Sequence, residues 1–513
     1  MQNGGVIVEF NRTRNSTRTF IFGVLCKIIS IIGPFLTRTI IIYKLGTDYL
    51  GLSSLFTSVL SILNISELGI GTAITFCLYK PVAEDDKTMV RALLSLLRKL
   101  YLAIGIIIIS VGLLMMPALN VLISGECPAD INLYILYLIY LINAASSYLG
   151  FAYKGVLLNV YQRGDISNKI ETITEILKYV LQIGILLLFE NYYWFAAILP
   201  FSTILITIST QVVSKSFYPD LYPEGEVPKE IKRIIKNKVI YLSAHSIAGT
   251  LTNSVDNIVI SSVIGLTAIA VYGNYSYITS SVLSFILIAY RALTPAIGNS
   301  LCAESKEKNL KLFNSLQFLC FWTITWCCTC LLCLFQPFIT FWIGKENLLN
   351  FSVVIMIVLY FYSNATRQLY GTYVGAAGLW NRTLPRQIIS AILNLVLDVM
   401  LVKKYGIGGI VFASFASNFF VSLPLDVLVT YKDIMNVRVS KGYISLCTRT
   451  IVTTLICAVS YIICSHIKIG GLLSLIIRSV ICIIVPNLIM YIFYCKSEEF
   501  LYMKSHLKGM IKK

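Results

Sequence analysis

Long apolar stretches alternate with short polar stretches along the whole chain. Nearly uncharged runs recur throughout the sequence, and a helix of about 20 apolar residues spans a bilayer. The predicted helices are 18–43, 50–79, 98–123, 131–157, 167–189, 192–213, 239–264, 268–300, 312–343, 350–376, 385–402, 407–430, 443–466 and 470–495. Helices leave no backbone polar group unpaired in lipid. The pattern therefore predicts an all-α polytopic membrane protein with about 14 transmembrane helices.

The two halves of the chain share short matches at a common offset. Ala83-Glu84 and Ala303-Glu304 are separated by 220 positions, and so are "YKG" (153–155) and "YVG" (373–375). The repeat predicts two six-helix lobes related by a pseudo-two-fold axis along the membrane normal, plus an unrepeated C-terminal helix pair. The expected domains are a tail (1–17), an N-terminal lobe (18–213), a linker (214–238), a C-terminal lobe (239–431), the helix pair (432–495) and a second tail (496–513). Duplicated halves around a central site are typical of secondary transporters.

The distribution of charge predicts the orientation in the membrane. Of the 513 residues, 57% are apolar and only 13% are charged, and the net charge is +17. The even-numbered loops and both tails, together with the helix ends beside them, carry 31 of the 42 Lys and Arg residues, whereas the odd-numbered loops carry five. Cytoplasmic loops are enriched in Lys and Arg. Both termini are therefore expected in the cytoplasm, and the basic charge is not taken as a sign of nucleic-acid binding.

The sequence contains no motif for an enzyme or a resident cofactor. Neither a Walker phosphate-binding loop, a G-x-S-x-G elbow nor an H-E-x-x-H zinc motif occurs. No loop is long enough to hold an enzyme domain. The stretch "WCCTCLLC" (326–333) includes four of the 14 cysteines, but a metal cluster is disfavoured because neighbouring cysteines on one helix point about 100° apart and no histidine lies nearby. No disulfide framework is implied.

Charged residues inside the spans are the candidate functional groups. A charge at the bilayer centre costs about 2.5–3.5 kcal/mol and usually faces protein or a water-filled cavity. Glu67 lies deep in the second helix, and Arg291 lies near its equivalent position in the repeat. The two are expected either to form an ion pair between the halves or to act separately as gating or coupling groups. Lys178 and Asp398, again 220 positions apart, are a second candidate pair, although Glu175 is also placed to pair with Lys178 one helical turn away.

Further polar groups predict a hydrated cavity. Asp256 and Asn257 belong to a polar run in the seventh helix, and Arg367 is a lone cation in the tenth. Arg14, Arg18 and Lys27 form a basic series leading inward along the first helix. This series either sets the topology or attracts a phosphate-bearing substrate. Arg38, Asp426 and Arg478 lie nearer the ends of the spans, and no binding role is expected of them.

Three stretches resemble the flippases of the Wzx type. They are "LGTDYLGLSSLFTSVLSILNISELGIGTAITFCLYKPVAEDDK" (45–87), "YKGVLLNVYQRGD" (153–165) and "DNIVISSVIGLTAIAVYGNYSYI" (256–278). These flippases belong to the multidrug/oligosaccharidyl-lipid/polysaccharide exporter superfamily. The resemblance covers nearly the whole chain, and its positional matches include Glu67, Asp256 and Gln162. Proteins of this type often have twelve spans, so the last helix pair departs from the pattern.

The resemblance implies both a function and a set of partners. The expected substrate is an undecaprenyl-diphosphate-linked oligosaccharide, flipped by alternating access across the bacterial cytoplasmic membrane for O-antigen, capsule, exopolysaccharide or lipopolysaccharide assembly. Helices 1, 2, 7 and 8 would line a central cationic cavity, and helices 13 and 14 would provide a groove for the lipid tail. Membrane lipids and other polysaccharide-assembly proteins are the expected partners, and the coupling ion would be H⁺ or Na⁺. The alternatives are a cation-coupled multidrug exporter and, less favoured, an integral-membrane glycan polymerase.

Overall fold

A computed structural model describes residues 12–64, 69–125, 127–150, 152–467 and 469–511. Every element within these residues is helical, which confirms the all-α fold class. The chain divides into two compact units, Met1–Thr250 and Leu251–Lys513, and the division falls inside helix α9. The domain limits expected from the sequence remain predictions.

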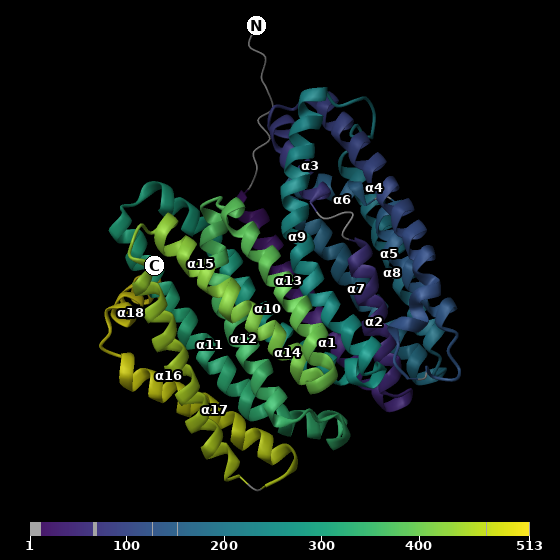
Figure 1. The fold of residues 1–513 in the computed structure, drawn as a ribbon. Helices are drawn as coiled ribbons and strands as arrows, with labels where there is room; N and C mark the ends of the chain where they lie inside the picture. Colours follow the sequence, from purple (N-terminus) through teal and green to yellow (C-terminus); the bar gives the residue numbers. More distant parts are fainter. Residues whose placement is uncertain (1–11, 65–68, 126, 151, 468, 512–513) are drawn as a thin grey trace. The chain divides into compact units, whose positions relative to one another are not determined.

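The first unit contains the helices that precede this division (Figure 1). They are α1 (Arg12–Lys44), α2 (Thr47–Leu63), α3 (Ile70–Ala83), α4 (Lys87–Met115) with the 3₁₀ turn η2 (Met116–Leu122), α5 (Leu133–Leu149), α6 (Tyr153–Val160), α7 (Gly164–Leu188), α8 (Tyr192–Phe217) and most of α9 (Lys229–Val263). Side-chain caps begin three of them: Asp86 accepts from Met89 N, Asn132 from Tyr134 N and Asn191 from Trp194 N. Such caps satisfy backbone donors that a helix start leaves free.

The second unit contains the remaining helices. They are α10 (Leu266–Ala303), α11 (Lys306–Ile343), the 3₁₀ turn η3 (Lys345–Asn347), α12 (Phe351–Ala376), α13 (Trp380–Tyr405), α14 (Ile407–Ala416), the π-helix η4 (Ser417–Ser422), α15 (Leu423–Val429), the π-helix η5 (Thr430–Ile434), α16 (Val439–Ser465), α17 (Gly471–Tyr494) and α18 (Glu498–Ile511). Gly406 separates α13 from α14 with a φ of 55°, a left-handed conformation that favours glycine and lets the chain reverse direction within one residue.

The same order of helix packing occurs in both units. In the first unit α4 packs on α5, α5 on α8 and α7 on α8; in the second, α11 packs on α12, α12 on α14 and α13 on α14. These pairs correspond to one another in the repeat predicted from the sequence. The second unit adds α16 and α17, which pack on each other and on α11, and these are the yellow helices beside α11 in Figure 1. Phe318, Phe321, Ile456 and Met490 form a buried core between them.

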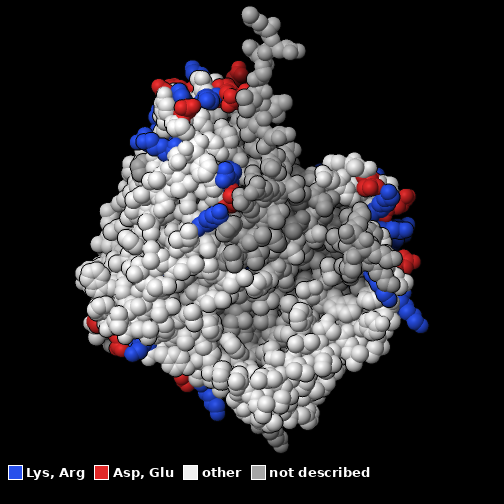
Figure 2. Space-filling view, turned by 180° about the vertical axis from the view of Figure 1, so that it is seen from behind, with Lys and Arg blue, Asp and Glu red and all other residues white. Residues whose placement is uncertain are grey.

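The surface and the helix lengths identify a multi-pass membrane protein. Seven helices of the described chain are long and apolar enough to cross a membrane, and the bent pair α5–α6 would make an eighth. Shorter apolar helices include α2 and α3. Figure 2 shows broad areas of described surface without Lys, Arg, Asp or Glu.

Candidate functional site

Two rows of buried polar residues face each other inside the second unit. Helix α13 contributes Arg386, Ser390, Asn394 and Asp398, and the segment from α14 to α15 contributes Ser414, Ser417, Asn418, Ser422 and Asp426. We call these nine residues the polar seam. None of them is more than 9% exposed. Buried polar groups are stable only where they find partners, so the two rows of the seam pack against each other.

Contacts across the polar seam follow an antiparallel order. Asn394 Nδ2 lies 3.3 Å from Ser414 Oγ, and Ser390 Oγ donates to Ser417 O at 3.1 Å. The order follows from the reversal at Gly406, which makes α13 and α14 run in opposite directions. Ser417 begins the π-helix η4. Such turns are rare and often lie at functional sites.

One end of the seam holds two buried carboxylates. Asp256 of α9 is 6% exposed and Asp398 of α13 is fully buried, and their carboxyl groups face each other beside Asn394. Ser414 Oγ donates to Asp256 Oδ2 at 2.7 Å. Within the described chain, no donor reaches Asp256 Oδ1 or either oxygen of Asp398. We call Asp256, Asn394, Asp398 and Ser414 the acidic end.

The acidic end has the chemistry of a site for a hard cation or a proton. Two adjacent carboxylates repel each other, and a buried charge is stable only beside a compensating charge. The side chains of Asp256, Asn394, Asp398 and Ser414 all carry oxygen atoms, the ligand type that hard cations prefer. A bound monovalent cation or a shared proton would supply the missing positive charge.

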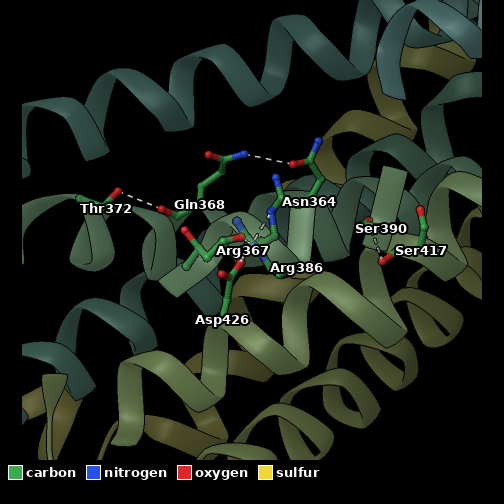
Figure 3. A network of polar contacts seen from close by, with 9 residues as sticks. Asn364, Arg367, Gln368, Thr372, Arg386, Ser390, Ser417 and Asp426 are labelled. Atoms are coloured by element: carbon green, nitrogen blue, oxygen red, sulfur yellow. Dashed lines mark hydrogen bonds and ion pairs between the residues drawn. The ribbon is translucent and has the colours of Figure 1, made fainter. Parts of the chain in front are cut away.

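The other end of the seam joins one carboxylate to two arginines. Figure 3 shows Arg367 of α12 and Arg386 of α13 converging on Asp426. Arg386 Nη1 donates to Asp426 Oδ2, and Arg367 Nε lies 3.9 Å from the same oxygen. The Arg386 side chain is 8% exposed, whereas that of Arg367 is 28% exposed. Along α13, this arginine end lies about 18 Å from Asp398 at 1.5 Å per residue.

Helix α12 carries a polar face beside the arginine end. Gln368 Nε2 donates to Asn364 Oδ1 at 3.0 Å, and Thr372 Oγ1 donates to Gln368 O at 2.9 Å (Figure 3). Asn364, Arg367 and Gln368 are partly exposed and share one side of the helix at spacings of three and four residues. A polar face on a membrane helix usually borders protein or water rather than lipid, so this face could contact an anionic, polar ligand through Arg367.

The structure places only some of the residues singled out in the sequence. Glu67 lies outside the described residues, and so do the side chains of Arg14, Arg18 and Arg291, although their backbones belong to α1 and α10. Their proposed roles remain predictions.

Lys27 on α1 and Asn257 on α9 are described, and both are partly exposed. Lys178 Nζ lies 2.5 Å from Glu175 Oε1, one turn away on α7, as expected for that pair. The pairing of Lys178 with Asp398 across the halves is still a prediction.

Sequence reasoning misses Arg386, Asn394, Ser414 and the importance of Asp426. It does not single out Arg386, which lies near the start of the predicted helix 385–402, and it gives Asp426 no binding role. The signal is the spacing of these residues: Arg386, Ser390, Asn394 and Asp398 recur every four residues, and the other residues of 388–402 are apolar. A polar row at helical spacing marks one face of a helix, and that face is the polar seam.

Comparison with known proteins defines the fold. No family model matches the sequence, and no match is found among curated proteins. Among solved structures, the lipid II flippase MurJ in an inward closed conformation aligns with a TM-score of 0.64 and 14% identity, over 94% of this chain and 99% of that one.

Multidrug transporters align over less of this chain. An inward-facing MATE transporter of the MOP superfamily gives a TM-score of 0.58 at 15% identity, over 82% of this chain and 95% of the other. The Vibrio cholerae MATE transporter VcmN, in a mutant form, gives 0.57 at 13% identity, over 83% of this chain and 98% of the other. The chain therefore has the fold shared by the MurJ flippase and the MATE transporters.

Proposed function

We propose that this chain is a transporter of the MOP superfamily and flips a lipid-linked oligosaccharide diphosphate across a bacterial cytoplasmic membrane. The observation that favours a lipid-linked substrate is the extent of the match. The lipid II flippase covers 94% of this chain, whereas the two multidrug transporters cover 82% and 83%. We infer that the fold is of the flippase kind, and that the glycan serves surface polysaccharide assembly, as in the Wzx-type proteins that the sequence resembles.

The substrate diphosphate would be bound by arginine and lysine side chains. Arg367 is the described candidate, because Asp426 already bonds to Arg386 and the two arginines together carry one more charge than that carboxylate neutralises. Arginine binds phosphate through paired hydrogen bonds. Arg14, Arg18, Lys27 and Arg291 remain candidates for the same role, and Glu67 remains the candidate gating group.

We further infer that a monovalent cation, Na⁺ or H⁺, drives the transport from the acidic end. Cation binding there would neutralise one of two adjacent buried carboxylates and so favour close packing of α9, α13 and α14. A ligand changes a conformational equilibrium only by binding one state better than another. The acidic end meets this requirement if its three helices separate in one of the two states of alternating access.

Reconstituted vesicles test the proposal. The purified full-length chain is placed in liposomes containing a fluorescent undecaprenyl-diphosphate disaccharide, and a membrane-impermeant quencher reports movement between leaflets under a Na⁺ or H⁺ gradient. We expect gradient-dependent flipping that Asp398→Asn abolishes. We also expect Na⁺ at 100 times its Kd to stabilise the native chain by about 2.7 kcal/mol, and Asp398→Asn to remove this effect.

The controls separate the alternatives. Asp433→Asn changes an exposed carboxylate on η5 and should leave flipping and its ion dependence unchanged. Efflux of a cationic dye without lipid movement would contradict the flippase and support a multidrug exporter. Flipping that is indifferent to both gradients and to Asp398→Asn would refute the coupling role of the acidic end while leaving the substrate assignment intact.

A further inference from the structure

Four cysteines from three helices meet inside the second unit. Cys330 and Cys333 lie on α11, Cys464 on α16 and Cys482 on α17. The sulfur atoms of Cys333, Cys464 and Cys482 all lie within 4.8 Å of one another, and these residues are 1%, 0% and 0% exposed. Cys330 is partly buried against them and is in contact with Cys482. We call these four residues the thiol cluster.

Helix packing creates the cluster from cysteines that are distant in the sequence. Cys330 and Cys333 are three residues apart and therefore share one face of α11. Both α16 and α17 pack on α11, and they bring Cys464 and Cys482 to that face. The sequence alone disfavours a metal cluster in "WCCTCLLC", because adjacent cysteines on a helix diverge. The packing changes this interpretation, since Cys327 and Cys328 are not part of the cluster and two other helices provide the missing ligands.

Ordinary packing is the alternative explanation. Cysteine often acts as a small apolar residue in helix contacts, and Leu334, Tyr461 and Ile481 complete an apolar surrounding. The hydrogen bond that Cys482 Sγ donates to Thr329 O is long, at 4.0 Å. Packing alone does not require three sulfur atoms to converge. A metal does, because three sulfurs in a plane around an ion at about 2.3 Å are about 4 Å apart.

We propose that the thiol cluster binds one Cu(I) ion through Cys333, Cys464 and Cys482, with Cys330 available as a further ligand. Thiolates select soft cations such as Cu(I), and the group of potential ligands in the described chain contains sulfur only. On binding, the coordinating thiols lose their protons to the solvent, and the Cu–S bonds form from the resulting thiolates. Structural Zn²⁺ sites have four ligands in a tetrahedron, whereas three sulfur atoms converge here. No change of oxidation state is involved.

A bound ion would connect the C-terminal helix pair to the rest of the second unit. Each of α11, α16 and α17 supplies one ligand, so the ion would link three helices at a single point. Metal that binds the folded state but not separated helices stabilises the folded arrangement. The proposed role is therefore structural and is independent of the transport function proposed above.

Metal binding to the purified full-length chain tests the proposal. The protein is kept anaerobic in detergent, and Cu(I) is supplied as its bicinchoninate complex, whose colour reports transfer of the ion. We expect the chain to retain about one Cu(I) and its melting temperature to rise. Cys333→Ala, Cys464→Ala and Cys482→Ala should each weaken binding by about 10–100-fold or more, since even outer-sphere changes cost that much.

A matched control uses two other buried cysteines on the same helices. The double variant Cys328→Ala with Cys457→Ala should bind Cu(I) as the native chain does, because both lie on α11 and α16 outside the cluster. Alanine keeps the sites small and apolar, and size-exclusion elution shows whether each variant is folded. The proposal is overturned if the native chain retains no Cu(I), prefers Zn²⁺ when both are offered, or loses copper equally in the control. A disulfide found within the cluster of the freshly purified protein would also contradict it.

Discussion

At the scale of single residues, the arginine end of the seam depends on one carboxylate. Asp426 is 1% exposed and bonds to Arg386, which is itself buried, while the longer contact with Arg367 involves a more exposed side chain. Removing one member of a buried ion pair leaves the other charge without compensation, and that loss exceeds the net contribution of the pair. Substitutions of Asp426, Arg386 and Arg367 should therefore change the stability of the protein by different amounts.

Asp426→Asn should destabilise the protein by about 3–5 kcal/mol, because Arg386 would remain charged and buried. Arg367→Gln should cost about 1 kcal/mol or less, because the side chain is 28% exposed and its contact is 3.9 Å long. Thermal unfolding in detergent, followed by intrinsic fluorescence, compares the two.

A double variant provides the control for this comparison. Asp426→Leu with Arg386→Leu removes both charges and should recover most of the lost stability. Equal destabilisation by Asp426→Asn and Arg367→Gln would show that Arg386 is not the main partner of Asp426.

Part of the candidate site could be predicted from the sequence, and part could not. Asp256, Asp398 and Arg367 stand out because a charge inside an apolar span is costly and therefore informative. Their partners do not, since Asn394 and Ser414 are uncharged and common in membrane helices. The contact between Asp256 and Asp398 depends on how α9 packs against α13, and no spacing within either helix contains that information.

At the scale of elements, each of the fourteen predicted segments is mostly helical over the residues that the structure describes. The length of an apolar stretch is a strong signal because every membrane helix must span the same thickness of bilayer.

The breaks within the predicted helices are not predicted by the sequence. The second and fourth segments are each divided into two helices, and the twelfth contains π-helical turns. Such breaks depend on packing and on local hydrogen bonds, which hydropathy does not record. Helix α18 was not predicted because its sequence is polar.

Close packing of α13 against α14 predicts different effects for two adjacent glycines. A Cβ on Gly409 would lie 2.7 Å from Leu401 O, a backbone atom that cannot move away easily. A Cβ on Gly408 would lie 3.4 Å from Val353 Cγ2, an ordinary contact. Gly409→Ala should therefore destabilise the protein by about 1–3 kcal/mol through overpacking.

Gly408→Ala is the matched control and should be neutral or slightly stabilising, because alanine favours helix by about 1 kcal/mol over glycine. Melting temperatures of the two variants in the same detergent compare them. If Gly409→Ala is tolerated as well as Gly408→Ala, α13 and α14 are not as close near Gly406 as the structure indicates.

At the scale of the whole molecule, ion pairs in the first unit join loops that lie at the same end of its helices. Lys44 Nζ lies 2.7 Å from Glu190 Oε1, which joins the end of α1 to the connection between α7 and α8. At the start of α4, Lys87 Nζ lies 3.3 Å from Asp220 Oδ2 in the segment that follows α8. The first pair involves odd-numbered loops and the second even-numbered loops. Odd-numbered loops therefore lie at one end of the helices and even-numbered loops at the other, as the predicted topology requires. The ion pairs do not show which end faces the cytoplasm.

The bias of 31 Lys and Arg residues to five between the two sets of loops predicts that orientation. A membrane-impermeant maleimide applied to intact cells should label a cysteine placed at Asp48 or Glu346. It should not label one at Lys87 or Lys306 until the membrane is made permeable. Lys87 is preferable to its neighbour Asp86, whose side chain caps α4 through Met89 N and whose loss would disturb the helix start. The unmodified chain provides the background from its native cysteines, of which Cys302 and Cys447 are exposed.

The reverse labelling pattern would place both termini outside the cytoplasm. The basic series on α1 would then open toward the wrong side of the membrane to receive a substrate made in the cytoplasm, and the proposed direction of flipping would fail with it.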